Sequence, residues 1–141
     1  MLQLLRADLV RRGVIVEVSL KVDLPYVNAD RVPIEQVLIN IIGNACDAME
    51  ANAPGDRMIR ILTGADADAA YIRIIDGGAG LPALPDRVFA PFYTTKTDGL
   101  GLGLAISRSI VAAHGGRLWA EANDGRGSTF HVNLPLMVEA K

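Results

Sequence analysis

The sequence predicts an α+β domain in which one mixed β-sheet carries its helices on one face. Two observations support this fold class. Runs typical of strands occur in both halves of the chain, separated by two stretches of helical periodicity, and turn residues separate most of these segments. The chain has 141 residues, of which 50% are hydrophobic, so it has room for one domain over 1–141 with a single core.

The first third of the chain predicts the order helix, strand, helix. Apolar residues at helical spacing in 2–12 indicate a short amphipathic helix that ends at Gly13. Residues 14–22 then alternate as a strand. Asp30 is suited to cap a long helix that continues to about Glu50.

Two strands and a long loop are predicted next. Residues 58–63 and 71–75 are rich in β-formers and are joined by a short linker, which predicts an antiparallel pair. The second strand ends directly at Asp76. From 77 to 103, glycine and proline interrupt every periodic pattern except a short turn near 86–89. A structured loop of this length usually has a functional reason.

The last part of the chain predicts a helix followed by a hairpin. Apolar residues in 104–113 repeat at helical spacing until His114 and two glycines end the pattern. Residues 117–122 and 128–134 are strands, and the residues between them have the composition of a hairpin turn.

Composition narrows the functional classes. The net charge is −2, the pI is near 5.6 and the 14 Lys and Arg residues are scattered, so no nucleic-acid partner is expected. The single cysteine, Cys46, cannot form an internal disulfide, which favours a reducing cytoplasm. The longest apolar stretch is too short to cross a bilayer. We therefore expect a cytoplasmic segment without direct membrane contact, with any membrane anchor of the full-length protein lying elsewhere.

Asn40 and Asn44 are four residues apart on the predicted long helix, so they lie on one face. A carboxamide oxygen is a hard neutral ligand that suits Mg²⁺, which keeps most of its waters and bridges phosphates. The alternative is that the two amides only hydrogen-bond a neighbouring loop, as buried polar groups do.

Asp76 stands at a strand end directly before Gly77, Gly78 and Gly80. An ionised carboxylate can accept a hydrogen bond from the exocyclic amine of adenine, where guanine presents an oxygen. The glycines allow a flat base to approach closely. The alternative is an aspartate that merely starts a glycine turn.

Three glycines, Gly99, Gly101 and Gly103, precede the helix that begins near Leu104. Free amides and the positive end of the helix dipole would face a bound anion there, which suits a triphosphate. Residues 92–96 could clasp the phosphates with Lys96 supplying charge, unless this lysine is simply solvated. Together these segments predict that the domain binds ATP.

Four motifs in this order carry a family resemblance over nearly the whole chain. Residues 35–48 resemble the N box, 76–80 the first glycine box, 89–92 the F box and 99–104 the second glycine box. The chain thus resembles the catalytic, ATP-binding domain of sensor histidine kinases, within the wider superfamily of gyrase, chaperone, kinase and mismatch-repair ATPases.

The resemblance implies a two-layer α/β sandwich, the Bergerat-type ATP-binding fold, with 77–100 as a mobile ATP lid. It also implies that Asn44 ligates Mg²⁺, that Asn40 supports the phosphate end and that Asp76 reads adenine. The cofactor-binding set that goes with this resemblance is completed by Asp47, Gly78, Gly80, Thr95, Lys96, Gly101, Leu102, Gly103, Leu104 and Ser128.

Two members of this set need comment. Ser128 lies in a strand motif whose hydroxyl reaches the adenine region in the family, and Thr129 is the alternative. Asp47 is a departure, because many family members carry a basic residue at its position, whereas a subset of the family, which the Asn-Ala-x-x-Ala-Met pattern of this chain resembles, carries an acidic one. Lys96 is then expected to supply the missing positive charge.

Asn40 separates two functions within the superfamily. The hydrolysing members that the chain resembles place a glutamate four residues before the metal-binding asparagine, as a general base for water. An amide is no useful base, so hydrolysis should be slow. We expect phosphoryl transfer to a histidine, with Asn40, Asn44 and Lys96 contributing positioning and charge neutralisation around Mg²⁺.

The acceptor is not expected on this chain. Neither His114 nor His131 is followed by the acidic residue expected of a phosphoacceptor, so both are predicted to be structural. His114 could cap its own helix end. The expected partners are a phosphoacceptor histidine domain, absent from this segment, and a response regulator downstream. An ATP hydrolase of the gyrase or mismatch-repair type, a non-catalytic nucleotide-binding signalling module and a serine kinase of anti-sigma type are the alternatives.

The remaining large apolar side chains carry little functional information. Trp119 and Phe130 are expected to fill the core, and Cys46 is expected to be a small buried residue.

Overall fold

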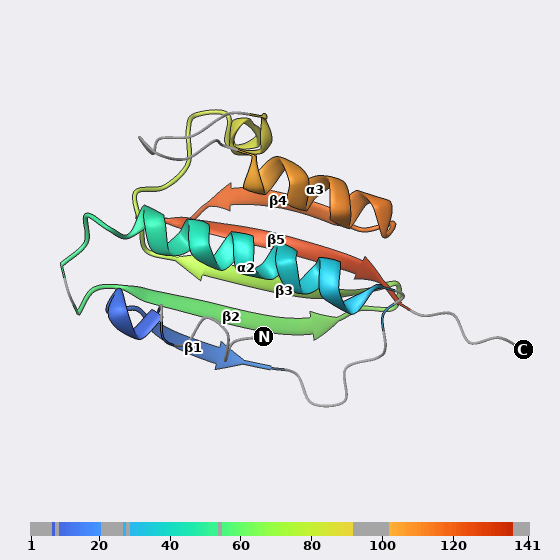
Figure 1. The fold of residues 1–141 in the computed structure, drawn as a ribbon, viewed down its shortest axis with the longest axis horizontal. Coiled ribbons are helices and arrows are strands. Elements are labelled where there is room, and N and C mark those ends of the chain that lie inside the picture. The colour runs from blue at the N-terminus through green and yellow to red at the C-terminus, as the bar shows by residue number, and fades with distance from the viewer. Residues whose placement is uncertain are drawn as a thin grey trace, which may run out of the picture.

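The computed structural model describes residues 7, 9–20, 27, 29–53, 55–91 and 102–136. Three predicted site residues, Thr95, Lys96 and Gly101, lie outside the described residues, as does most of the predicted first helix. The elements run in the order β1 (Ile15–Ser19), α2 (Arg31–Ala48), β2 (Met58–Ala65), β3 (Ala69–Asp76), the 3₁₀ helix η1 (Pro85–Phe89), α3 (Gly103–Ala113), β4 (Arg117–Ala122) and β5 (Ser128–Pro135) (Figure 1).

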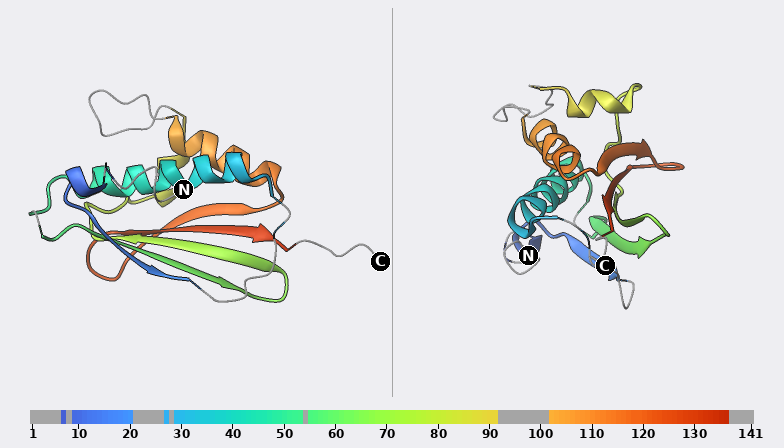
Figure 2. Two further views of the ribbon diagram at one scale, coloured as in Figure 1. Left: turned by 60° about the horizontal axis from the view of Figure 1, so that its bottom comes forward. Right: turned by 90° about the vertical axis from the view of Figure 1, so that its right-hand side faces the viewer.

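The strands form one mixed sheet in the order β1-β2-β3-β5-β4. β1 and β2 are parallel and are connected through α2, whereas the other neighbouring pairs are antiparallel. Figure 2 shows α2 and α3 over the same face of this sheet, with the opposite face uncovered. The predicted mixed sheet with helices on one face is therefore confirmed.

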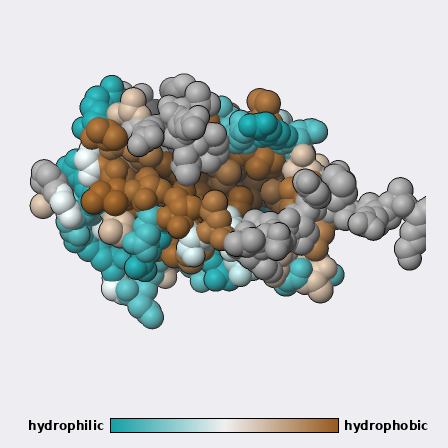
Figure 3. Space-filling model, turned by 90° about the horizontal axis from the view of Figure 1, so that it is seen from below, coloured by the Kyte–Doolittle hydropathy of each residue, from teal (hydrophilic) through white to brown (hydrophobic). Residues whose placement is uncertain are grey.

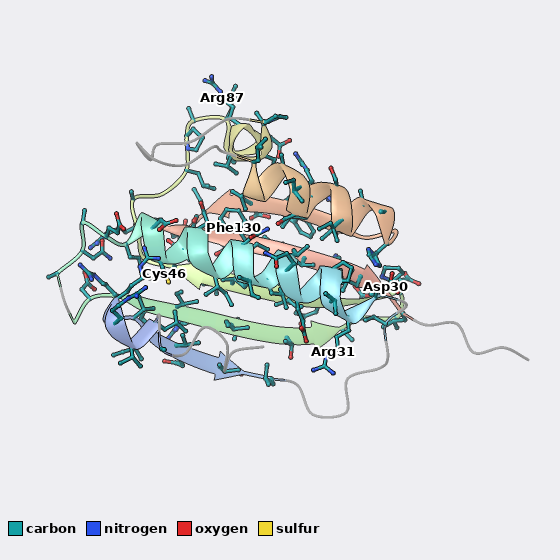
Figure 4. The ribbon with its side chains drawn as sticks, viewed as in Figure 1. Asp30, Arg31, Cys46, Arg87 and Phe130 are labelled. Carbon is teal, nitrogen blue, oxygen red and sulfur yellow. The ribbon has the colours of Figure 1, made fainter. Side chains whose placement is uncertain are left out.

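The core lies between this helix layer and the sheet. Buried and partly exposed residues alternate along β5, so that its residues 128, 130, 132 and 134 face the helices. Phe130 is completely buried, and Figure 4 places it where α2 and α3 run side by side in front of the sheet. Burial of such a side chain stabilises the fold by roughly 1.5–3 kcal/mol. The predictions that Phe130 and Cys46 are buried are confirmed.

Trp119 does not fill this core, and that prediction is wrong. Its neighbours Leu118 and Ala120 take the helix-facing positions of β4, which leaves Trp119 on the uncovered face of the sheet. There its indole stacks on His131 with ring centroids 4.7 Å apart, and the Arg117 guanidinium lies 4.4 Å from the indole centroid.

A histidine links the N-terminal end of α2 to the C-terminal end of α3. Asp30 takes the N-cap position of α2 with an extended backbone, but its side chain makes no cap hydrogen bond. Instead its Oδ2 lies 3.5 Å from Nε2 of His114, which follows α3. Nδ1 of His114 lies 2.7 Å from the carbonyl oxygen of Ile110, so the predicted cap of its own helix end is confirmed.

Element ends differ from the prediction by a few residues. β1 is shorter than the predicted 14–22, and α2 ends two residues before Glu50. β2 and β3 are longer, because the Asp66 carboxylate accepts hydrogen bonds from the backbone amides of Asp68 and Ala69 and so closes a tight turn.

The long loop after β3 is anchored to the core by η1. Val88 and Phe89 are buried, and the Phe89 ring meets Phe130 edge-on with centroids 6.0 Å apart. The Arg108 guanidinium of α3 covers the Phe89 ring at 4.4 Å. The predicted short turn near 86–89 is therefore a 3₁₀ helix that is held between β5 and α3.

Figure 3 shows the molecule from the β1 edge, where hydrophobic side chains form a band across the middle of the face. Ile15 and Val18 of β1 are 57% and 39% exposed. Among the described residues, no helix is long and apolar enough to cross a membrane.

Candidate functional site

Asp76 is the buried centre of the candidate site. It is the last residue of β3 and only 2% of its surface is exposed. Its Oδ1 accepts a hydrogen bond from the backbone amide of Gly78 at 2.8 Å, and its Oδ2 accepts one from the Ser128 hydroxyl at 3.0 Å. A carboxylate has about four acceptor positions, so these two bonds leave capacity for a ligand.

Burial sets the electrostatics of this carboxylate. Desolvation raises the pKa of Asp76, while the hydrogen bonds from Gly78 and Ser128 oppose the shift. Among the described residues, no cation pairs with the carboxylate. The site therefore holds a strong hydrogen-bond acceptor, and a ligand N–H group that donated to it would stabilise its negative charge.

Of the two hydroxyls considered from the sequence, Ser128 is the one that hydrogen-bonds to the Asp76 carboxylate. Asp76 and Ser128 stand opposite each other on β3 and β5, on the helix-facing side of the sheet. Thr129 faces the other side and donates a hydrogen bond to Oδ1 of Asn123.

The glycine turn after Asp76 packs against the end of α2. The backbone amide of Ala79 donates to the carbonyl oxygen of Ala48 at 2.9 Å. A Cβ at Gly78 would lie 2.6 Å from that oxygen, so only glycine fits without movement of the backbone. Gly80, two residues after Gly78, adopts a positive φ of 91°.

Two supporting residues were missed from the sequence. Asn123 donates a hydrogen bond from Nδ2 to the backbone carbonyl oxygen of Asp76 at 2.9 Å. Gly127, with φ of 92°, approaches the same carbonyl so closely that a Cβ there would lie 2.0 Å from it. Gly127 directly precedes Ser128, so its place in that strand motif was the available signal, whereas Asn123 offered only the composition of a turn.

Asn40 joins α2 to the start of α3. Its Nδ2 donates to the Ser107 hydroxyl at 3.0 Å and lies 3.4 Å from the carbonyl oxygen of Gly103. Its Oδ1 accepts a hydrogen bond from Gln36 Nε2 at 3.1 Å. Ser107 is completely buried and was not singled out from the sequence.

Asn44 lies one turn further along α2, on the same face as Asn40. It is half-buried, and none of the described residues hydrogen-bonds to its side chain. No described residue therefore occupies its carboxamide oxygen, which is available to ligate a cation. No cluster of three or more His, Cys, Asp or Glu side chains that could hold a metal occurs among the described residues.

The first turn of α3 is the part of the candidate site whose backbone could receive an anion. Leu102 is the N-cap of this helix, Gly103 and Leu104 open it, and its first turn holds no acidic residue. The first N–H groups of a helix have no intrahelical acceptor, and the helix dipole favours an anion beside them. The structure thus brings this turn against the middle of α2, where Asn40 lies.

Asp47 follows Asn44 by three residues, and its Oδ1 accepts a hydrogen bond from Nη2 of Arg12 at 2.7 Å. Arg12 comes from the turn before β1 and had no role in the sequence interpretation. The structure therefore places a basic side chain directly against the acidic residue that the sequence analysis singled out as a departure.

Neither histidine lies in this site. His114 caps α3, and His131 stacks on Trp119 on the uncovered face of the sheet. Burial lowers the pKa of His131, and Glu121, whose Oε1 lies 3.6 Å away, opposes that shift. The prediction that both histidines have structural environments agrees with these contacts.

Comparison with known proteins gives this geometry its context. The family described as histidine kinase-, DNA gyrase B- and HSP90-like ATPases matches residues 29–138. The sensor protein FixL of Bradyrhizobium diazoefficiens is 43% identical over 119 residues, which are 83% of this chain and 23% of FixL. The chain thus spans about a quarter of the length of this curated relative.

Solved structures agree with the fold. The catalytic domain of histidine kinase ThkA matches with a TM-score of 0.80 at 32% identity, over 95% of this chain and 86% of that domain. ThkA in complex with the response regulator TrrA matches with a TM-score of 0.78 at 29% identity, over 96% and 38% of the chains. Full-length ShkA in complex with AMPPNP matches with a TM-score of 0.80 at 28% identity, over 99% and 29%.

Proposed function

The chain belongs to the family of histidine kinase-, DNA gyrase B- and HSP90-like ATPases, and we propose that it is the catalytic domain of a sensor histidine kinase. In this role the domain binds ATP with Mg²⁺ and donates the γ-phosphoryl group to a histidine of another domain. The sensor and histidine-kinase relatives support this choice within the family.

The observation that carries the proposal is the buried carboxylate of Asp76. It lies at the end of the site that would receive adenine, which we call the base end. Its remaining acceptor capacity fits the exocyclic amine of adenine and disfavours guanine, which presents an oxygen at that position. Gly127 brings its backbone close to the Asp76 carbonyl without a Cβ in between, and Gly78 does the same against Ala48 at the end of α2. The binding of AMPPNP, an ATP analogue, by the similar protein ShkA agrees with an adenine nucleotide as ligand.

Asn44 would hold Mg²⁺ between its carboxamide oxygen and the phosphates. A single neutral protein ligand fits Mg²⁺, because this ion keeps several waters and takes the rest of its oxygens from phosphate groups. When bound, the ion would neutralise charge on the β- and γ-phosphates.

The chain's own contribution to transfer is positioning. The first turn of α3 faces the phosphate end, and Asn40 fixes this turn against α2 through Ser107 and Gly103. Both ends of the Asn40 amide are occupied by hydrogen bonds, and an amide cannot take a proton from water near neutral pH. The γ-phosphoryl group is therefore kept for an acceptor other than water. Thr95, Lys96 and Gly101 complete the phosphate end in this proposal.

The proposed acceptor is a histidine on a helical dimerisation domain, in the same protein or its dimer mate, with a response regulator downstream. The complex of ThkA with the response regulator TrrA supports this order of partners. The proposed location is the cytoplasm, where ATP and a response regulator are available, and no direct membrane contact is assigned to this segment.

A domain replacement tests the proposal. The catalytic domain of ThkA is replaced by this chain, and the hybrid is incubated with γ-labelled ATP and Mg²⁺. We expect acid-labile, base-stable label on the hybrid, which is the signature of phosphohistidine, and much slower labelling at the same low ATP concentration when Asp76 is changed to Asn. Steady phosphate release by the isolated domain without any protein label would instead identify a hydrolase.

A further inference from the structure

Arg12 reaches the candidate site from outside every motif that the sequence singled out. It lies in the turn between the helical residues 9–11 and β1. Its Nη2 contacts Asp47 Oδ1 at 2.7 Å and Glu50 Oε1 at 3.3 Å. The side chains of Arg12 and Asp47 are each only 23% exposed, so this ion pair is better shielded from solvent than other arginine–carboxylate pairs among the described residues, such as Arg60 with Glu17 and Arg126 with Asp56.

Asp47 shares one face of α2 with the residues assigned to the phosphate end. It follows Asn40 by seven residues and Asn44 by three, and both spacings return to the same side of a helix. A carboxylate on this face repels a triphosphate unless a cation offsets its charge. The guanidinium of Arg12 is a cation in direct contact with it, with Nη2 2.7 Å from Oδ1.

The backbone of Arg12 is tied to the base end of the site by a second set of hydrogen bonds. Its carbonyl oxygen accepts from Arg57 Nη1 at 2.8 Å, and Arg57 also donates to the carbonyl oxygen of Asn52. Asn52 Nδ2 in turn donates to the carbonyl oxygen of Gly77 at 3.1 Å, directly after Asp76. One arginine is thus linked to both ends of the site.

We propose that Arg12 is a positioning residue of the nucleotide site, where its guanidinium offsets the charge of Asp47 beside the phosphates and its backbone supports the glycine turn. This inference rests on the proposed function. It also assigns a role to the segment before β1, because any displacement of that segment would expose the phosphates to the carboxylate of Asp47.

The test compares ATP, ADP and AMP in equilibrium titrations of the same domain, in low salt. We expect Arg12→Ala to weaken ATP about tenfold, ADP less and AMP least, because the repulsion grows with phosphate charge. The loss should shrink in high salt. Arg12→Lys, which keeps a positive charge, should recover much of the ATP affinity.

Two further variants separate charge from folding. Asp47→Asn leaves the guanidinium in place and removes the carboxylate, so it should bind ATP as tightly as the unchanged domain or several-fold more tightly. Asp47→Asn combined with Arg12→Ala should restore most of the affinity lost in Arg12→Ala alone. Arg60→Ala is the matched control, since it removes an exposed pair with Glu17.

Equal losses for all three nucleotides, or no rescue by Asp47→Asn, would overturn the inference and leave Arg12 a structural residue. Unchanged ATP affinity in Arg12→Ala would also overturn it. The proposed function fails separately, if the unchanged domain does not bind ATP at all.

Discussion

Replacement of Asp76 by Asn is the sharpest perturbation of the base end of the site. The change keeps the shape of the side chain and removes its charge. The new amide can still accept from the Gly78 backbone through its oxygen, and its NH₂ group can donate to the Ser128 hydroxyl oxygen. The fold of the free domain is therefore expected to survive.

The stability of the variant has a predictable direction. Burial raises the pKa of Asp76, so the folded domain binds this proton more tightly than the unfolded chain does. The contribution of Asp76 to stability is therefore present at low pH and is lost as the pH rises through the raised pKa, which means that the ionised carboxylate destabilises the domain near neutral pH. At pH 7 we expect Asp76→Asn to unfold at the same temperature as the unchanged domain or at a higher one.

The affinity for ATP should fall in the same variant, even though its stability is unchanged or higher. A hydrogen bond to a charged acceptor is worth about 1 to 3 kcal/mol, so its loss weakens ATP by about 5- to 150-fold. An amide NH₂ that faces the adenine amine places two donors against each other, which favours the upper part of this range.

Calorimetric titration with ATP at pH 7, together with thermal unfolding, measures both effects. Asp68→Asn is the matched control, because Asp68 is exposed in the turn between β2 and β3. If Asp76→Asn bound ATP within twofold of the unchanged domain, the adenine assignment would be refuted. A lower unfolding temperature would refute the electrostatic argument.

Three further predictions concern neighbouring residues and pH. Gly78→Ala should destabilise the domain by about 1–3 kcal/mol because its Cβ would lie 2.6 Å from a backbone oxygen, whereas Gly77→Ala, with nothing within 4 Å, should leave the unfolding temperature nearly unchanged. Ser128→Ala should weaken ATP binding about fivefold, since it removes one hydrogen bond of about 1 kcal/mol from the buried carboxylate. Thr129→Val should leave the ATP affinity unchanged, and if calorimetry showed the same loss of affinity in both variants, the role of the Ser128–Asp76 hydrogen bond would be contradicted. Because burial lowers the pKa of His131, the domain should lose stability as the pH falls from about 6.5 through that lowered pKa; His131→Phe should flatten this part of the curve of unfolding temperature against pH, and an unchanged curve would contradict the reasoning.

Local patterns predicted most elements of the fold, and they singled out Asp76 as a candidate site residue, for physical reasons. β5 alternates between buried and partly exposed residues, and α3 repeats its apolar residues at helical spacing, so both elements are visible within short windows. Asp76 was found because a strand end followed by glycines is a local feature.

Features that depend on which segments meet in space were not predicted. Trp119 was assigned to the core by the burial tendency of its residue type, but the helices cover the face of β4 that carries Leu118 and Ala120, which leaves Trp119 on the other face. Arg12 lies 35 residues from Asp47 in the sequence, and only the fold brings the two side chains together. Asn123 reaches Asp76 across 47 residues in the same way.

The central claim, an adenine-specific Mg-nucleotide site built around Asp76, is tested most directly by titration of the unchanged domain with ATP and with GTP, each with Mg²⁺ and with EDTA. We predict that ATP binds at least tenfold more tightly than GTP and that EDTA weakens it. Equal affinity for the two nucleotides, or no binding of ATP, would contradict the account.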